Sequence, residues 1–262
     1  MTKTVAVVGA TGKLGRLVCS IIEESEEFEL VAQIGSRGSL DDMVAADFVV
    51  DVTTPAVSQD VVDFAVDHGL NVLVGTSGWS SDRIDSLEKR VAAKNAADGS
   101  TVGVIVIPNF SLGSILATAF AAMAARFFDS IEIIESHSAS KVDSPSGTAT
   151  RTAELIGNAR ASLGPVVAPH TDQRARGQQV SSVPIHSLRM QGVVAKQDVV
   201  FGGQGEVLTL SHETIEQTAY VAGIRLALAA LAEARGVIVG LDKLIDLSAN
   251  PSPQAPAPVE TT

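Results

Sequence analysis

The sequence has almost no cysteine: Cys19 is the only one among 262 residues. A single thiol cannot form an intrachain disulfide and cannot build a thiolate zinc cluster within one chain. This composition is typical of proteins that work in a reducing compartment. We therefore expect neither a disulfide nor a bound metal.

Basic residues are scarce relative to acidic ones. The chain has 19 Lys and Arg against 30 Asp and Glu, which gives a formal net charge of -11 and an isoelectric point near 4.8. Binding to a nucleic acid backbone needs a clustered excess of Lys and Arg. The composition argues against a nucleic acid partner, so an anionic ligand must be met by a few locally placed cations.

Long apolar segments are also missing. No stretch approaches the roughly 20 apolar residues that a membrane span needs. The first apolar run, residues 5–8, is followed by a glycine-rich turn and not by a cleavage site. We therefore expect no membrane association and a cytoplasmic location. The hydrophobic content of 45% is still enough to build a full core.

In the first 108 residues, short β-branched runs alternate with segments of helical periodicity. The runs are typical of buried parallel strands, and each helical segment has one apolar face to lay on a sheet. The expected strands are 4–8, 30–34, 48–52, 71–74 and 102–107, and the expected helices are 14–22, 56–66 and 83–91. This pattern predicts an α/β fold with a Rossmann-type doubly wound parallel sheet, as a dinucleotide-binding domain over residues 1–108.

Residues 109–216 have a different pattern, which predicts an α+β domain with an open mixed sheet. We assign substrate binding and oligomerisation to this domain. The expected elements are helices 112–127 and 148–161, strands 131–135, 182–189, 198–201 and 206–212, a polar loop over 164–180, and a hairpin turn at Gly202-Gly203. A helix over 217–234 is expected to return to the first domain, which residues 217–247 complete. Residues 248–262, rich in Pro, Ala and Ser, are predicted to be disordered.

A glycine-rich turn directly follows the first strand and opens the first helix. Glycines in that setting let the backbone approach a pyrophosphate, while the helix N-terminus supplies partial positive charge. The alternative is a glycine-rich turn in a fold that binds no nucleotide. We favour a dinucleotide site, whose expected residues here are Gly9, Ala10, Thr11, Gly12, Lys13 and Leu14.

The end of the second strand distinguishes NADH from NADPH, because an acidic residue there binds ribose hydroxyls and repels a 2'-phosphate. The stretch Gln33 to Arg37 has no acidic residue. Ser36 can donate a hydrogen bond and Arg37 a charged one to that phosphate. Arg37 is also compatible with a solvated surface role. The pattern predicts NADPH as the preferred cofactor, with NADH possible.

Three further loops fall where strands of such a sheet end, and ligands bind at that edge. Each loop alone is an ordinary turn, but together they predict the border of a nicotinamide site. They are residues 51–55, residues 75–78 with Gly75, Thr76 and Ser77, and the loop after the fifth strand with Ile107, Pro108, Asn109 and Phe110.

The most specific segment is residues 135–149, which joins a strand to a helix in the second domain. His137 and Lys141 lie four residues apart in a loop. Ser146 can cap the following helix, so that the amides of Gly147 and Thr148 point outward as a cradle for a carboxylate. Taken singly, His137 is compatible with a packed or surface histidine and Lys141 with a solvated charge.

This segment resembles the signature of the dihydrodipicolinate reductase family, in which Glu, His, His, Lys and Asp precede Pro-Ser-Gly-Thr-Ala at this spacing. The resemblance extends to residues 5–15, 75–78, 108–110 and 183–189. It implies an NAD(P)H-dependent oxidoreductase that converts 4-hydroxy-tetrahydrodipicolinate to tetrahydrodipicolinate in diaminopimelate and lysine biosynthesis. The substrate implied is a small dicarboxylate.

The resemblance also implies residue roles. His137 corresponds to the proton donor, since an imidazole can protonate the ring carbon of the enamine that hydride addition leaves. Lys141 corresponds to the catalytic cation, which stabilises developing charge and binds a carboxylate. Gly147 and Thr148 correspond to the second carboxylate contact. The glycine turn and the rim loops correspond to the dinucleotide contacts, and Arg37 lies near a 2'-phosphate contact.

One departure from the family pattern is Ser138, which stands where the family has a second His. A hydroxyl is shorter and cannot carry positive charge. If that position binds a substrate carboxylate, Ser138 weakens substrate binding and leaves the chemistry of His137 and Lys141 intact.

Two alternatives stay open: a divergent reductase of another small imine or carbonyl acid, and a non-catalytic dinucleotide-sensing protein, which would not need His137 and Lys141. An open sheet leaves edges and a face that need cover, and the family is usually tetrameric, so we expect a homotetramer.

Overall fold

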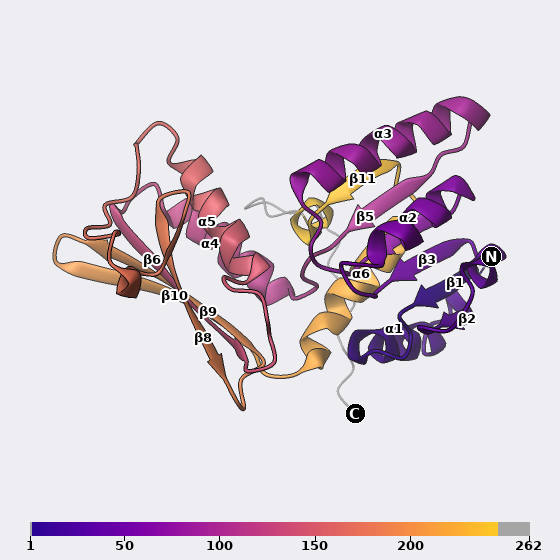
Figure 1. The fold of residues 1–262 in the computed structure, drawn as a ribbon, viewed down its shortest axis with the longest axis horizontal. Coiled ribbons are helices and arrows are strands. Elements are labelled where there is room, and N and C mark those ends of the chain that lie inside the picture. The colour runs from indigo at the N-terminus through magenta and orange to yellow at the C-terminus, as the bar shows by residue number, and fades with distance from the viewer. Residues whose placement is uncertain (1, 246–262) are drawn as a thin grey trace.

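The computed structural model describes residues 2–245, which form two β-sheets with helices packed on them (Figure 1). The first sheet has six parallel strands in the order β11-β5-β4-β3-β1-β2. These strands are β1 (Lys3–Val8), β2 (Phe28–Ile34), β3 (Phe48–Asp51), β4 (Asn71–Val74), β5 (Gly103–Val106) and β11 (Gly236–Val239). The predicted disordered tail lies outside the described residues.

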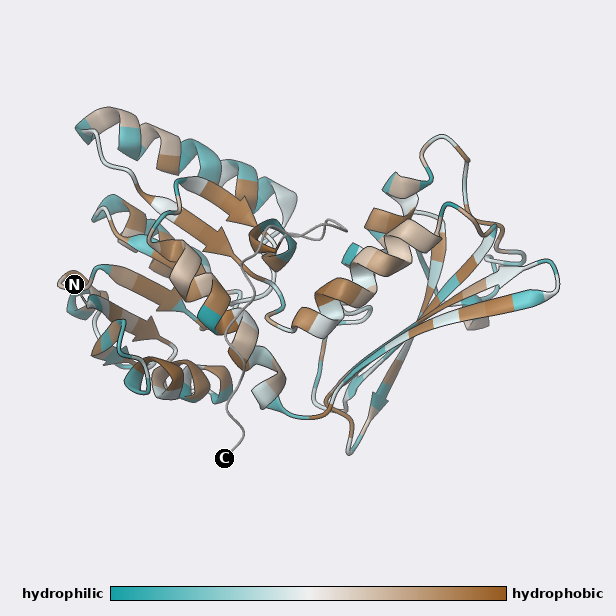
Figure 2. Ribbon diagram, turned by 180° about the vertical axis from the view of Figure 1, so that it is seen from behind, coloured by the Kyte–Doolittle hydropathy of each residue, from teal (hydrophilic) through white to brown (hydrophobic). Residues whose placement is uncertain are grey.

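Helices cover both faces of this sheet, because its central strands are apolar on both sides. In β1, Val5 and Val7 pack in one core with α1 (Lys13–Glu23) and α6 (Val221–Leu231), whereas Ala6 and Val8 pack in a second core with α2 (Ser58–Asp67) and α3 (Ser81–Asp98). Figure 2 shows these strands as almost continuously hydrophobic. The predicted doubly wound sheet is confirmed.

The end of the described chain differs from the expected single helix over 217–234. A 3₁₀ turn, Gln217–Tyr220, precedes α6, and β11 then pairs with β5 in parallel. Strand β11 was missed because a four-residue apolar run directly after a helix has no periodicity that separates it from that helix. The last segment does pack on the first sheet, as expected.

The second sheet has the order β10-β9-β6-β8-β7. Strands β6 and β8 pair in parallel and the other neighbours are antiparallel, so the predicted open mixed sheet is confirmed. Its core lies under α4 (Leu112–Ala124) and α5 (Gly147–Ala159), which cover one face. The strands are β6 (Ser130–Ser138), β7 (Gln178–Val180), β8 (Val183–Met190), β9 (Ala195–Gly203) and β10 (Glu206–Thr214).

The hairpin turn was predicted at the wrong residues. Gly202 and Gly203 belong to β9, and the turn is Gln204-Gly205, with Gly205 at φ +81°. Gly203 leaves room for an aromatic ring, since a Cβ there would lie 3.2 Å from Cε1 of Phe128. These two glycines therefore serve packing within the strand. The predicted polar loop over 164–180 also contains β7, a short edge strand.

Among the described residues, no helix combines the length and the apolar character that crossing a bilayer requires.

Candidate active site

The turn after β1 has the tight geometry that its glycines predicted. Gly9 adopts φ +88°, and a Cβ there would lie 2.5 Å from the carbonyl oxygen of Val52. Gly15 has less room still, because a Cβ would lie 2.1 Å from the oxygen of Gly9. The first glycine permits the turn, and the last lets α1 pack against it.

Helix α1 begins with amide groups that are open to a ligand. Gly12 is its N-cap, no side chain caps this end, and the first turn carries no acidic residue. Within residues 2–245, the amides of Lys13 and Leu14 have no hydrogen-bond acceptor. An anion here would meet free N–H groups and the positive end of the helix dipole. The turn therefore fits the pyrophosphate of a dinucleotide.

The loop after β2 lies beside this turn. The carbonyl of Ile34 accepts from the amide of Gly9 at 2.8 Å, and a Cβ on Gly35 would lie 3.2 Å from Cγ2 of Thr11. Ser36 and Arg37 follow, and both are exposed. Arg37 makes no ion pair or hydrogen bond within the described part of the chain.

The loops that follow β3, β4 and β5 pack on one another at the same edge. The amide of Gly75 donates to the oxygen of Asp51 at 2.8 Å, and a Cβ on Gly75 would lie 2.7 Å from the ring of Phe110. Ile107 and Phe110 are buried, so their side chains pack the rim, whereas Ser77 and Pro108 are exposed on it. The predicted cofactor residues thus lie at one edge of the sheet.

A buried carboxyl group stabilises this rim from below. Asp51 is fully buried and accepts from the amide and hydroxyl of Thr53 at 3.0 and 2.6 Å, and from the hydroxyl of Ser58. Trp79 Nε1 in turn donates to Ser58 Oγ at 3.0 Å. Burial raises the pKa of Asp51. The sequence indicated Asp51 only as part of the rim, since residues 51–55 lie where a predicted strand ends.

Asn109 connects the rim to the second sheet's helices. Its Nδ2 donates to Ser114 Oγ at 2.9 Å and to Thr148 Oγ1 at 3.3 Å, and its Oδ1 accepts from the amide of Ser111 at 2.9 Å. Nearby, Gly223 of α6 fits against the carbonyl of Phe110, where a Cβ would lie 1.9 Å from the oxygen. The Asn109–Thr148 hydrogen bond therefore joins a predicted cofactor residue directly to a predicted substrate residue.

The N-terminus of α5 has the cap that was predicted for the anion cradle. Ser146 is the N-cap, and its hydroxyl accepts from the amide of Ala149 at 3.2 Å. Gly147 is exposed, and a Cβ there would meet nothing within 4 Å. Thr152 fixes the turn from beneath by donating to the carbonyl of Thr148 at 2.9 Å. Within the described residues, the amides of Gly147 and Thr148 have no backbone acceptor, so they are available to an anion.

His137 lies at the end of β6, beside a buried carboxylate. Its Nδ1 is 2.6 Å from Oε2 of Glu135, whose residue is fully buried. Arg189 of β8 binds both oxygens of Glu135 at 2.9 Å, and the amide of Ser146 donates to Oε1 at 3.1 Å. Burial opposes ionisation of Glu135, but hydrogen bonds, chiefly from Arg189, outweigh it and lower its pKa.

Lys141 lies in the loop between β6 and α5. Its Nζ is 2.8 Å from Oδ1 of Asp143, a more exposed residue. Arg189 Nη2 donates to the carbonyl of Asp143 at 2.6 Å, which ties this loop to the Glu135 cluster. Burial opposes ionisation of Asp143, but the Lys141 ammonium outweighs it and lowers the pKa of that carboxyl.

Ser138 is the last residue of β6. Strand alternation directs it to the side opposite His137. Its hydroxyl lies 3.0 Å from Oγ of Ser140, and its carbonyl accepts from the amide of Lys141 at 3.0 Å. The structure thus shows Ser138 shaping the turn that carries Lys141.

Glu135 and Arg189 are the main site residues that sequence reasoning did not assign. The signal for Glu135 was present, since residues two apart in a strand share a face and Glu135 precedes His137 by two. Arg189 lies 54 positions further along the chain, so only the β6–β8 pairing, which sets it opposite His137, brings it here. His212 Nε2 lies 3.2 Å from the Ser111 hydroxyl, and burial lowers its pKa.

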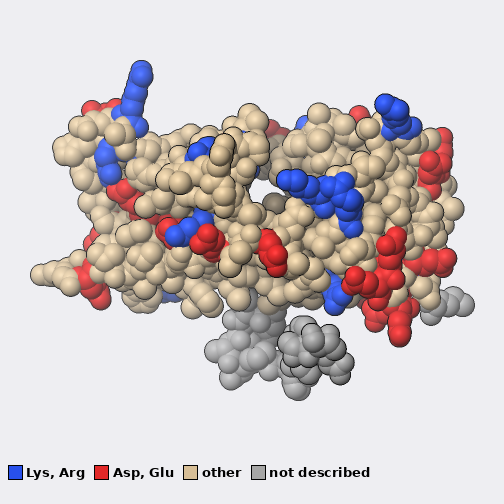
Figure 3. Space-filling view, turned by 90° about the horizontal axis from the view of Figure 1, so that it is seen from below, with Lys and Arg blue, Asp and Glu red and all other residues tan. Residues whose placement is uncertain are grey.

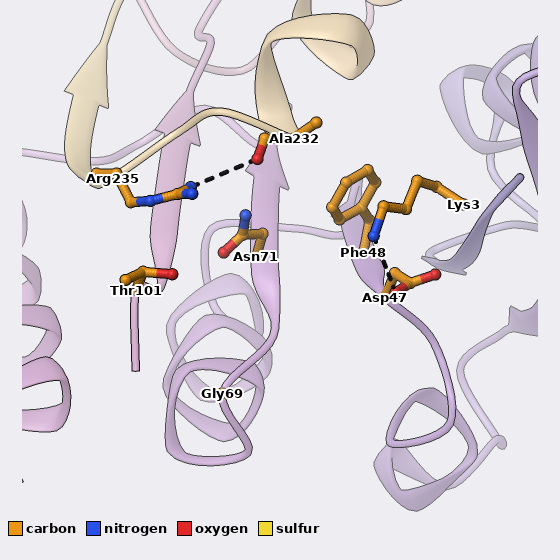
Figure 4. A pocket seen from close by; sticks show the side chains of 8 residues that line it. All are labelled: Lys3, Asp47, Phe48, Gly69, Asn71, Thr101, Ala232 and Arg235. Carbon is orange, nitrogen blue, oxygen red and sulfur yellow. Dashed lines mark hydrogen bonds and ion pairs between the residues drawn. The ribbon is translucent and has the colours of Figure 1, made fainter. Parts of the chain in front are cut away.

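A separate cavity lies at the other edge of the first sheet (Figure 4). It is lined by strand-start residues that include Lys3, Phe48 and Asn71. Its charged and amide side chains already have partners: Lys3 pairs with Asp47, Asn71 bonds to two backbone groups, and Arg235 donates to the carbonyl of Ala234. These groups are therefore less available to a ligand than the free amides of the glycine turn.

On the face seen from below, several basic side chains lie close together (Figure 3). Viewed from below, a gap opens between the two halves, and Lys and Arg side chains lie beside it on the half with the parallel sheet (Figure 3). For a chain with a net charge of -11, this grouping supplies local positive potential next to the gap.

Known proteins resemble both halves of the chain. The family model "Dihydrodipicolinate reductase, N-terminus" matches residues 3–110, and "Dihydrodipicolinate reductase, C-terminus" matches residues 113–245. A 4-hydroxy-tetrahydrodipicolinate reductase of Clavibacter sepedonicus is 68% identical over 247 residues, covering 94% of this chain and 87% of the relative. One of Streptomyces griseus is 39% identical over 250 residues, covering 93% and 98%.

A solved structure gives the same assignment. The dipicolinate-bound dihydrodipicolinate reductase from Paenisporosarcina sp. TG-14 aligns with a TM-score of 0.75 at 27% identity. The alignment covers 94% of this chain and 100% of that one. Because both family models match in order and together cover residues 3–110 and 113–245, this chain belongs to the dihydrodipicolinate reductase family.

Proposed function

We propose that this chain reduces 4-hydroxy-tetrahydrodipicolinate to tetrahydrodipicolinate with NAD(P)H, the activity for which its relatives are named. The observation that carries the proposal is the contact between Asn109 and Thr148, which joins the dinucleotide rim to the carboxylate cradle. A cofactor at the rim and an anion at the cradle would then be neighbours. A dinucleotide-sensing protein would not need this arrangement.

The glycine turn would hold the cofactor, with Gly9 to Leu14 at the pyrophosphate and residues Gly75 to Ser77 and Ile107 to Phe110 along the nicotinamide side. Bound NAD(P)H supplies the hydride. The unpaired amides of Lys13 and Leu14 support this assignment, since they offer donors to an anion. NADPH is the preferred form, because Ser36 and Arg37 are exposed beside Thr11 and no acidic residue is there to repel a 2'-phosphate.

The chain's own residues bind the dicarboxylate and move the proton. The amides of Gly147 and Thr148 bind one carboxylate at the positive end of α5. Lys141 supplies a cation that stabilises developing negative charge and binds carboxylate, exchanging its Asp143 partner for substrate. His137 protonates the ring carbon of the enamine that remains after reduction.

Ser138 is the position that favours a second candidate function. It stands where the family has a second His, and its hydroxyl bonds only to Ser140 within the described residues. With a neutral group there, a divergent reductase of another small imine or carbonyl acid remains the second candidate. A comparison of kcat/KM for the dicarboxylate and for mono-carboxylate analogues distinguishes the two.

We also propose a cytoplasmic homotetramer, in which residues 1–108 with 217–247 bind the dinucleotide and residues 109–216 bind substrate and form the interface. The sheet face opposite α4 and α5 supports the interface, because it exposes apolar side chains without a covering helix. These are Ile134, Leu188 and Met190, with 37%, 39% and 48% of their surface exposed. Sedimentation equilibrium of the purified chain measures the assembly.

The experiment that tests the activity measures NADPH oxidation with freshly prepared product of the preceding synthase, for the parent chain and for His137→Ala and Lys141→Ala. We expect turnover in the parent and a fall of kcat by about 10²–10⁴-fold in His137→Ala, the range general acid catalysis contributes. An inactive parent that still binds NADPH would favour the sensing protein.

A further inference from the structure

We infer that Glu135 is the positioning residue for the proton donor: it holds the Nδ1–H of His137, so that Nε2 is the atom that delivers the proton. This inference rests on the proposed function only for the identity of the reaction. The arrangement of the imidazole, the carboxylate and the guanidinium stands on the structure alone.

The carboxylate of Glu135 accepts four hydrogen bonds from His137, Arg189 and Ser146. Oε2 takes Nδ1 of His137 at 2.6 Å and Nη1 of Arg189 at 2.9 Å, while Oε1 takes Nη2 of Arg189 at 2.9 Å and the amide of Ser146 at 3.1 Å. An ionised carboxylate is acceptor-only, so Nδ1 must carry a hydrogen. The nitrogens are on opposite edges of the ring, which leaves Nε2 without a partner among the described residues.

Burying the Glu135–Arg189 ion pair costs desolvation free energy, which indicates a role beyond stability. A buried ion pair is commonly replaceable by apolar residues without loss of stability, so it is weak evidence for a stabilising role. Here the same carboxylate touches the proton donor and, through the Ser146 amide, the N-cap of the helix whose next residues form the carboxylate cradle. Glu135 therefore fixes two functional elements relative to each other.

The proton step balances with this tautomer. Over the whole reaction one hydride and one proton are added and the 4-hydroxyl group leaves as water. Hydride addition would leave an enamine anion, whose C=C electron pair takes the proton as the imidazolium breaks its Nε2–H bond. The charge on the ring nitrogen of the substrate then forms the C=N bond of the imine. Imidazole is left neutral with its hydrogen on Nδ1, still donated to Glu135, and solvent water restores the Nε2 proton. No rotation of the ring is required between turnovers.

The isosteric variant Glu135→Gln gives a specific expectation. If the NH₂ group of Gln replaced Oε1, it would lie against two groups that can only donate, the Arg189 guanidinium and the Ser146 amide. If the NH₂ group replaced Oε2, it would lie against Arg189 and His137. Of these partners only the imidazole can become an acceptor, by losing the hydrogen on Nδ1. The variant should therefore move the hydrogen of neutral His137 from Nδ1 to Nε2.

Solid-state ¹⁵N NMR of the full-length protein with labelled histidine measures this directly. The chain has five histidines, and the His137 signals are those lost in His137→Ala. At alkaline pH, where imidazoles are neutral, we expect a protonated Nδ1 in the parent and an unprotonated one in Glu135→Gln. We also expect kcat to fall by about 10²-fold, the lower end of general acid catalysis, with the Kd for NADPH unchanged.

Glu132→Gln is the matched control, because Glu132 binds His186 at 2.7 Å and Arg176 on the other face of the same strand. It changes the same kinds of group and should leave both His137 nitrogen signals as in the parent.

An unprotonated Nδ1 in the parent, which needs no variant to fold, would overturn the inference. So would a Glu135→Gln variant with parental kcat and tautomer while His137→Ala is inactive. Parental kcat in His137→Ala would instead remove the proton-donor role, and the role of Glu135 with it.

Discussion

Replacing Arg37 by Asp tests the cofactor preference most directly. Arg37 is exposed and makes no ion pair within residues 2–245, so the substitution breaks no internal contact. Its loop lies beside the glycine turn, where a Cβ on Gly35 would approach Thr11 to 3.2 Å. Any effect should therefore come from the 2'-phosphate, which NADPH has and NADH lacks.

The magnitude follows from two contributions. A hydrogen bond to a charged group contributes about 1.5–3 kcal/mol, and exposure to solvent reduces that to about 1 kcal/mol. An Asp in its place adds repulsion of about 1 kcal/mol at contact distance in water. The sum of about 2 kcal/mol corresponds to an increase of about 30-fold in the Kd for NADPH.

Fluorescence titration with NADPH and NADH gives both dissociation constants for the parent and the variant. The Kd for NADH should change little, and the effect on NADPH should shrink at high salt, because exposed charges are screened. Arg126→Asp makes the same charge change at another exposed position, after the C-terminal end of α4, and should leave both constants unchanged. Equal changes for the two cofactors, or an unchanged Kd for NADPH, would refute the role of Arg37.

Three further predictions concern single positions. Gly15→Ala places a Cβ 2.1 Å from the Gly9 oxygen. The free energy of unfolding should fall by about 1–3 kcal/mol, and NADPH should no longer raise the melting temperature. A parental Kd for NADPH would show that the turn tolerates a methyl group. Ser138→His restores the family's cation and should lower the KM for the dicarboxylate with kcat unchanged; an unaltered KM would show that position 138 does not contact substrate. Burial raises the pKa of Asp51 above its ordinary 3.8, so the stability that its proton provides is complete below pH 3.8 and is lost as pH rises through the folded-state pKa. Urea unfolding should therefore show the parent losing stability relative to Asp51→Asn over that rise, and a difference independent of pH would contradict this.

The first sheet was predictable because each of its first five strands has a recognisable local sequence pattern. The runs at β1, β3, β4 and β5 are apolar on both faces, and glycine turns or helices with one apolar face separate them. The same reasoning failed for β11, whose partner β5 lies more than a hundred residues earlier in the chain. Pairing over such a separation leaves no trace in a local pattern.

The candidate site was predictable where it depends on backbone conformation, that is, at the glycine turn and the helix cap. Gly9, Gly15 and the Ser146 cap are determined by turn geometry, and the structure shows the turn and the cap as expected. The Glu135–Arg189 pair depends on which strand lies beside β6, and sequence alone does not settle the order of strands in a mixed sheet. The Asn109–Thr148 contact likewise exists only once the two halves are folded together.

The chain crosses between its halves twice, after β5 and again before α6, and the two crossings touch where Gly223 meets the Phe110 carbonyl. A side chain at position 223 would force these two connections apart, because a Cβ there would lie 1.9 Å from the Phe110 oxygen. The close approach of the two segments that link the halves therefore depends on one missing methyl group.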